Sequence, residues 1–173
     1  MPKTLDSLSS ENREQRNRVH DLCRQYNRAP SNGHLKKLKQ AFLACGDDVF
    51  IEQGFVCDYG DKISLGDRVY ININCTCLDG GNIVIGDDVL IGPNVQLITV
   101  NHPLKPSERL LRTNLVEDLI IGDNVWIGAG AILLPGIKVA DGCVIAAGSI
   151  VTKNLEANCL YAGNPAVKIR RLE

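Results

Sequence analysis

An aliphatic residue returns at every sixth position along the last third of the chain. From residue 121 onward the sequence reads IGDNVW, IGAGAI, LLPGIK, VADGCV, IAAGSI and VTKNLE. The fourth residue of each unit is Asn or Gly, which adopt left-handed backbone angles at low cost. Each unit therefore predicts a short strand followed by a tight turn. Self-similarity at one fixed period is typical of folds built from stacked coils.

Three such units would form one coil of a triangular prism, and stacked coils would pair their strands in parallel. The aliphatic residues that open the units would then form buried columns, because only stacking removes these side chains from water. The expected neighbours are Ile121 with Val139, Ile127 with Ile145, and Leu133 with Val151. A set of ordinary hairpins is the alternative, but hairpin loops vary in length and this period does not.

The six-residue repeat begins near residue 49 with irregular spacing and is regular from Ile85 to Leu97. It then stops and resumes at Ile121. The interrupting text, HPLKPSERLLRTNLVED at residues 102–118, carries two prolines and six charged side chains. We therefore predict a loop extruded from the stack. A long loop on a rigid scaffold is a usual place for function.

The N-terminal part has a helical pattern instead. Residues 9–28 predict a helix that Ser10 could cap, and residues 34–45 predict a second, shorter helix. The chain is thus divided into a helical cap, residues 1–48, and a coil domain, residues 49–173. The helices are natural covers for the strand edges at the open end of the stack.

Composition excludes several classes of protein. The 173 residues include 19 basic and 20 acidic side chains, a net charge of −1, so nothing marks a nucleic-acid binder. The polar N-terminus predicts neither a signal peptide nor a membrane anchor. Seven cysteines without a CxxC motif predict a cytoplasmic protein with reduced thiols. Cys75 and Cys77 are expected to be small buried residues rather than metal ligands.

Three histidines are the first candidates for acid–base chemistry. His20 and His34 lie in the helical region and are interpreted as surface or packing residues. His102 stands where the repeat stops, beside Pro103, and imidazoles ordinarily titrate at about pH 6.5, which suits a base near neutral pH. From the residues alone, a catalytic and a structural role for His102 are equally supported.

Asn72 and Asn74 stand two apart in YININC, so a strand would point them the same way. An asparagine ladder or turn fits them as well as a functional role does. Trp126, the single tryptophan, ends its unit in an outward position. It would serve either in interface packing or as a platform for a substrate.

Several separate stretches together resemble one family. They are QRNRVHDLCRQYN, CDYG at residues 57–60, YININCTCLD at 70–79, VNHPLKPSER at 100–109, IGDNVWIGAGAILLPG, AAGSIVTK and AGNPA. From about residue 14 to residue 171 the chain resembles the hexapeptide-repeat acyltransferases, and within them the maltose/galactoside O-acetyltransferase group. The resemblance implies a mainly β fold, the left-handed parallel β-helix. It also implies a homotrimer with active sites between subunits, acetyl-CoA as co-substrate along the prism edge, and no metal.

The resemblance also implies residue roles. His102 would be the general base, and Asn72 would help to position the acceptor hydroxyl or the reaction centre. The residues implied on the acceptor side are Asp58, Tyr70, Asp79 and Trp126. The residues implied for coenzyme A are Ala129, Ala147, Thr152, Lys153, Lys168 and Arg170. As turn residues, Asp58 and Asp79 would need no functional explanation.

Some positions depart from the family pattern. The usual longer N-terminal box has no clear equivalent here, which leaves open an acceptor other than maltose or a galactoside. Positions that hold a Glu–Tyr pair and a Pro in many relatives are Asn114, Leu115 and Asp118, so Glu108 or Glu117 is left to orient His102. Val167 follows the NPA triplet where a basic residue is usual, which shifts the expected phosphate contact to Lys168 or Arg170.

The expected function is acetyl-CoA-dependent O-acetyl transfer, directly to a hydroxyl of a sugar or similar small acceptor, with a histidine base. An N-acetyltransferase acting on an amino sugar or amine, and a non-catalytic hexapeptide scaffold, are the alternatives. A γ-type carbonic anhydrase would need three zinc-binding histidines on the coils, and only His102 lies within the repeat.

Overall fold

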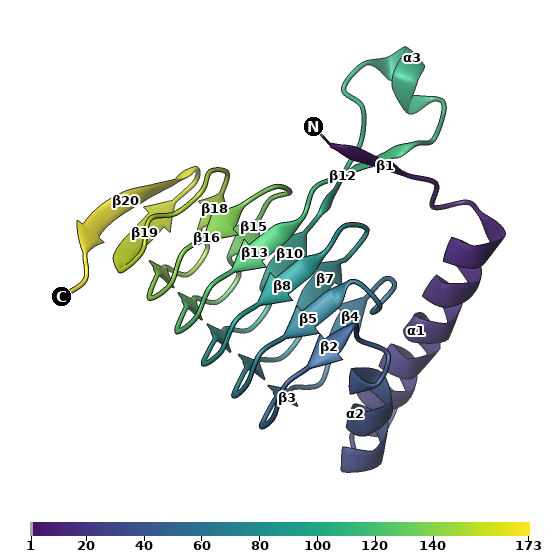
Figure 1. Ribbon diagram of the computed structural model, residues 1–173, viewed down its shortest axis with the longest axis horizontal. Coiled ribbons are helices and arrows are strands. Elements are labelled where there is room, and N and C mark those ends of the chain that lie inside the picture. Colours follow the sequence, from purple (N-terminus) through teal and green to yellow (C-terminus); the bar gives the residue numbers. More distant parts are fainter. Residues whose placement is uncertain (1) are drawn as a thin grey trace.

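The computed structural model describes residues 2–173 as a stack of coils with helices at one end (Figure 1). Three parallel sheets form the faces of the stack. Face 1 contains β2 (Ala44–Cys45), β5 (Ile63–Leu65), β8 (Ile83–Ile85), β13 (Leu119–Ile121) and β16 (Lys138–Val139). Face 2 contains β3 (Phe50–Ile51), β6 (Tyr70–Ile71), β9 (Leu90–Ile91), β14 (Trp126–Ile127), β17 (Val144–Ile145) and β19 (Cys159–Gly163), with β20 (Ala166–Arg171) antiparallel to β19. Face 3 contains β4 (Val56–Cys57), β7 (Thr76–Leu78), β10 (Gln96–Ile98), β15 (Ile132–Leu133) and β18 (Ile150–Val151).

The predicted β-helix and its columns are confirmed. The register pairs Ile121 with Val139, Ile127 with Ile145 and Leu133 with Val151. All six side chains are buried in one continuous core. Cys75 and Cys77 are buried in the same core, as expected.

The coils are not all of one length. Residues stacked on face 1 lie 20 positions apart in the early coils, from Leu65 to Ile85, and 18 apart later, from Ile121 to Val139. The third corner, where the chain passes from face 3 to face 1, takes up the difference. Asp79-Gly80-Gly81, which breaks the six-residue rhythm in the sequence, is this longer corner. The extruded loop leaves from the same corner one coil later, after β10.

The loop forms a small sheet of its own. β11 (Val100–Asn101) pairs antiparallel with β12 (Asn114–Val116), and β12 pairs with the N-terminal strand β1 (Lys3–Leu5). Between β11 and β12 lies the short helix α3 (Pro106–Arg109). In Figure 1 this loop and β1 project together from the stack.

The first corner, between faces 1 and 2, explains the repeated Gly-Asp pair. The Asp87 carboxylate accepts the backbone N–H of Asp67, and the Asp123 carboxylate accepts that of Asp87, each at 2.8 Å. Gly86 precedes Asp87 because any Cβ at that position would overlap the Asp123 carboxylate. Each coil therefore satisfies a donor of the coil before it.

The predicted left-handed turn positions are confirmed with one exception. Five of the six have positive φ, namely Asn124, Gly130, Gly136, Gly142 and Gly148. Asn154 does not, because the chain there turns in only four residues, from Val151 to the bridge at Leu155. Its side chain instead accepts the N–H of Lys138 at 2.8 Å.

Both N-terminal helices form, with corrected ends. Helix α1 spans Ser10–Arg28, and Ser9 rather than Ser10 caps it by accepting the N–H of Asn12. Helix α2 spans Asn32–Lys39 and stops short of the predicted residue 45. It stops because residues 44–45 pair with β5 and begin the first coil, four residues before the boundary expected at residue 48.

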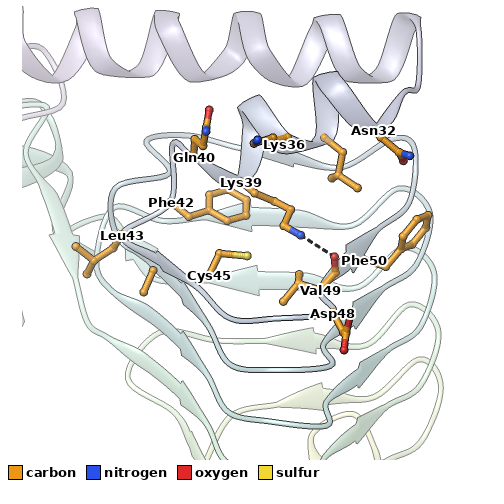
Figure 2. A pocket seen from close by; sticks show the side chains of 12 residues that line it. Asn32, Lys36, Lys39, Gln40, Phe42, Leu43, Cys45, Asp48, Val49 and Phe50 are labelled. Carbon is orange, nitrogen blue, oxygen red and sulfur yellow. Dashed lines mark hydrogen bonds between the residues drawn. The ribbon is translucent and has the colours of Figure 1, made fainter.

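The helices cover the open end of the stack with side chains. Backbone carbonyls of the first coil have no earlier coil to pair with, and three of them accept from the helical region instead. Lys39 Nζ donates to the Val49 carbonyl at 2.9 Å, and Asn27 Nδ2 donates to that of Phe55 at 2.9 Å. The Tyr26 hydroxyl donates to the carbonyl of Ile51. Figure 2 shows the Lys39 bond across a hollow of about 830 Å³ between α2 and the first coil.

In residues 2–173, no helix combines the length and the apolar character needed to cross a bilayer. All seven cysteines are free thiols.

Candidate active site

His102 lies in the extruded loop, directly after β11, and its side chain is exposed. It borders a hollow of about 330 Å³, whose other walls are Ser7, Leu8, Arg109, Arg112 and Asn114. The Arg109 guanidinium donates to the Pro103 carbonyl at 3.3 Å and to that of Leu104 at 3.2 Å, which closes the loop behind His102. The hollow is thus walled by the loop and by the segment that follows β1.

Glu108 and Glu117, the two carboxylates left to orient His102, form no hydrogen bond with its ring in residues 2–173, and neither does the nearby Asp118. Glu108 pairs with Lys105 at 3.1 Å. The Asp118 carboxylate accepts the N–H of Asn82 at 2.8 Å, and Glu117 lies beside Gly136. Within residues 2–173 no carboxylate hydrogen-bonds to the His102 ring, which leaves the imidazole free to turn toward a substrate.

Asn72 and Asn74 do not share a strand face, contrary to the spacing argument. Strand β6 ends at Ile71, and both asparagines lie in the second corner, between faces 2 and 3. Asn74 has a φ of 59° and forms the left-handed position of the turn. The Asn72 side-chain oxygen accepts the N–H of Ile73 at 2.8 Å, which leaves its amide NH₂ free for a ligand.

Tyr70 and Trp126 lie on the outer side of face 2. Both pair in register with Leu90, which stands between them. The Trp126 side chain is 56% exposed. The Tyr70 hydroxyl donates to Glu52 at 2.8 Å, a bond that raises the pKa of the tyrosine, and its ring stacks on Phe50. These two residues form one apolar wall with polar edges.

Asp58 lies at the third corner of the first coil and faces helix α1. Its carboxylate is 3.2 Å from His20 Nε2. Both side chains line a cavity of about 310 Å³ between α1 and face 3. The sequence offered no signal for this pair, because His20 resembles any polar residue of a surface helix.

Asp79 is fully buried, and its place is structural. Its carboxylate accepts the backbone N–H groups of Asp58, Tyr59 and Gly60, at 2.7, 3.1 and 2.6 Å. Burial raises the pKa of this carboxyl group, and the three donors oppose that shift. Asp79 therefore shapes the turn that presents Asp58, which corrects the expectation that it faces an acceptor.

The second corner carries a row of small residues. Ala129 and Ala147 lie one coil apart there, and the Ala129 carbonyl accepts the N–H of Gly148 at 2.8 Å. Gly128 allows this close approach, since a Cβ at that position would overlap the backbone of Ala147. Backbone groups along this edge are open to a bound chain molecule.

The remaining cofactor candidates lie elsewhere on the surface. Thr152 and Lys153 are exposed at the third corner of the fifth coil. Lys168 and Arg170 are on β20, where Lys168 forms an ion pair with Glu156 at 2.7 Å.

The candidate residues thus divide between two edges of the prism. Asn72, Ala129 and Ala147 belong to the second corner, whereas the His102 loop leaves from the third. Face 3 separates these corners by the roughly extended residues 95–99, about 13 Å at strand spacing. One chain therefore does not bring His102 and Asn72 together.

Known proteins share this fold and sequence. The family model described as bacterial transferase hexapeptide (six repeats) matches residues 118–153. A putative acetyltransferase of Saccharomyces cerevisiae is 38% identical over 144 residues, which are 83% of this chain and 74% of that protein.

Two solved structures extend the likeness over nearly the whole chain. A maltose O-acetyltransferase from Clostridium difficile superposes with a TM-score of 0.95 and 35% identity, covering 99% of this chain and 94% of that one. A hexapeptide-repeat acetyltransferase from Vibrio cholerae, complexed with acetyl coenzyme A, gives 0.90 and 32%, covering 98% and 93%. The chain belongs to the hexapeptide-repeat acyltransferases.

Proposed function

We propose that this enzyme transfers the acetyl group of acetyl-CoA directly to a hydroxyl group of a sugar or similar small acceptor, with His102 as general base. The observation that carries the proposal is the position of His102. It is exposed on a loop held by Arg109, it borders a hollow large enough for part of a sugar, and no carboxylate of residues 2–173 hydrogen-bonds to its ring. The acetyl coenzyme A complex of the Vibrio cholerae relative supports the choice of donor.

The reaction needs one proton carrier. His102 takes the acceptor hydroxyl proton while that oxygen attacks the thioester carbonyl carbon. The tetrahedral intermediate collapses by breaking the carbon–sulfur bond, and the imidazolium returns its proton to the departing thiolate. The products are the acetyl ester and the free thiol of coenzyme A. The free amide NH₂ of Asn72 is suited to position the acceptor or to stabilise the oxyanion.

We further propose that the site is shared between two subunits of a homotrimer. His102, Thr152 and Lys153 are at the third corner or on its loop, and Asn72, Ala129 and Ala147 are at the second. Packing the third corner of one subunit against the second corner of the next would join the two sets. Threefold closure repeats that contact with every subunit.

The binding groups follow from the same arrangement. The small-residue edge at Ala129 and Ala147 would hold the pantetheine arm, while Lys153, Lys168 and Arg170 would meet the phosphates. Tyr70, Trp126 and Asp58 would contact the acceptor, since stacking and charge-assisted hydrogen bonds both suit a sugar.

A panel of sugars, amino sugars and simple amines, assayed for release of free thiol from acetyl-CoA, tests the proposal. Turnover with hydroxyl acceptors is expected. Turnover confined to amines would replace O-acetylation by N-acetylation. If calorimetry detects no binding of acetyl-CoA, the chain is a scaffold and the proposal is wrong.

A further inference from the structure

Two thiols from different parts of the fold contact each other behind the His20–Asp58 pair. Cys23 lies on α1 and Cys57 on β4, and their sulfur atoms are 4.0 Å apart. Both side chains are only 2% exposed. Among the cysteines of residues 2–173, no other two sulfurs are in hydrogen-bonding contact, so this pair is distinct from the five remaining thiols.

A cavity gives small molecules access to the pair. The space of about 310 Å³ between α1 and face 3 is lined by both cysteines and also by His20, Arg24 and Asp58. The His20 and Asp58 side chains are 39% and 26% exposed, so the cavity reaches the surface beside them. Hydrogen peroxide is close to water in size and polarity, and it fits such a space.

The two thiols have different roles in any oxidation. The hydrogen bond from Cys57 lowers the pKa of the Cys23 thiol, and burial and the Asp79 carboxylate oppose that shift while Arg24 supports it. The same contact, together with burial, raises the pKa of Cys57. Cys23 is therefore the thiolate that reacts first, because the thiolate is the nucleophile.

We propose that Cys23 and Cys57 form a modification site at which a peroxide makes a disulfide between helix α1 and the first coil. The Cys23 thiolate attacks one peroxide oxygen, the O–O bond breaks, and the leaving oxygen takes a proton to become water. The Cys57 sulfur then attacks the resulting sulfenic acid, its proton goes to the departing hydroxide, and the S–S bond forms. Two thiols lose two electrons and two protons, and the peroxide becomes two waters.

The bond would change how the helical cap is held. In the reduced protein α1 is attached to the first coil through side-chain contacts, including the hydrogen bonds from Tyr26 and Asn27 to backbone carbonyls of that coil. A disulfide between residues 34 positions apart restricts the unfolded chain. Oxidation is therefore expected to raise the midpoint of thermal unfolding by several degrees.

The full chain, reduced and then exposed to a small excess of hydrogen peroxide, tests this directly. Catalase and N-ethylmaleimide are added before denaturation, and tryptic peptides are identified by mass spectrometry without reduction. The expected result is a linked pair of peptides containing Cys23 and Cys57, with a higher unfolding midpoint that dithiothreitol reverses.

Three variants sharpen the result. Cys23→Ser and Cys57→Ala should lose both the link and the peroxide-dependent rise. Cys75→Ser, which replaces a cysteine that is also 2% exposed, should retain both. A link between Cys57 and Cys77, oxidation of Cys23 to sulfinic acid without a link, or a link that leaves the midpoint unchanged would each overturn the proposal. None of these readouts depends on acetyl transfer.

Discussion

Tyr70 and Trp126 lie on the same outer face of one sheet, paired in register with opposite sides of Leu90. The seventeen loop residues 102–118 interrupt the stack between β9 and β14, yet the loop does not separate these strands, because it leaves from another corner. These two aromatic residues on face 2 and His102, whose loop leaves from the third corner, are therefore on different sides of one chain. This separation makes the proposed sharing between subunits open to a direct test.

Mixed oligomers of two inactive variants should recover activity. His102→Ala and Asn72→Ala, each alone, are expected to lose most of their turnover. If one subunit supplies His102 and its neighbour supplies Asn72, random co-assembly gives about a quarter of the sites both intact residues. Acetyl-CoA thiol release by the co-expressed mixture measures this.

The matched control mixes His102→Ala with His102→Gln, where no combination restores the base. A mixture of the first two variants that stays as inactive as this control would mean that both residues act from the same subunit, or that the shared site is wrong.

Removal of the imidazole at residue 102 should lower the rate of the chemical step without lowering the thermal stability of the fold. His102→Ala is expected to lower kcat by about 10²- to 10⁴-fold, the usual contribution of a general base. The thermal midpoint should stay unchanged, because the side chain is exposed and its ring hydrogen-bonds to no carboxylate in the described part of the chain, residues 2–173. His34→Ala is the control, since that ring lies in the helical region and hydrogen-bonds to the Ala29 carbonyl. Equal rates for both variants would remove His102 from the mechanism.

Asp79→Ala should lower the free energy of unfolding far more than the same substitution at an ordinary corner aspartate. It leaves three buried N–H donors without an acceptor, at about 1–3 kcal/mol each and not fully additive, so a loss of about 3–5 kcal/mol is expected. Asp87→Ala removes the acceptor of a single donor and should cost about 1 kcal/mol. Urea unfolding followed by Trp126 fluorescence, at one protein concentration, compares them. Similar losses would show that Asp79 does not hold the turn.

The ion pair between Glu156 and Lys168 should add a small, pH-dependent contribution to stability. The hydrogen bond from Lys168 lowers the pKa of Glu156 below its ordinary 4.5. Stability from this pair is thus fully present above pH 4.5 and is lost as the pH falls through the lowered folded value. Thermal midpoints across this acidic range should fall less in Lys168→Met than in the unmodified protein.

The dependence of stability on ionic strength is a second test of this ion pair. Both side chains are exposed, so high ionic strength should erase the difference between the two proteins. A difference that persists in high salt, or that stays the same as the pH falls well below 4.5, would contradict an ion-pair origin.

The stack itself was predictable from sequence, and much of the site was not. The strict six-residue period predicts that Ile121, Ile127 and Leu133 are buried, because every coil buries the residue at the same position of its repeat. By contrast, Ser7 and Leu8 reach the His102 hollow only because β1 pairs with β12 across most of the chain, and no local pattern encodes a pairing so distant. Asp79 was misassigned for a related reason, since its three donors belong to the preceding coil.

The end of α2 shows a different limit. Leu35, Leu38 and Cys45 satisfy helical spacing, yet Cys45 belongs to a strand. The free edge of β5 offers hydrogen bonds to residues 44–45, and this tertiary pairing outweighs the local preference. Helix propensity depends on the local sequence alone, so it does not include the hydrogen bonds that the edge of β5 offers.

The third corner varies in length. It holds extra residues in some coils and the whole His102 loop in another, so segments can be inserted there without changing the rest of the stack. Strands on either side of that corner pair with the coils above and below, not with each other, so added length leaves every register unchanged. Segments between Thr99 and Leu119 are therefore suited to exchange among related chains as cassettes. Swapping this one insert would change the loop that carries His102, while the buried columns beneath it keep the same packing.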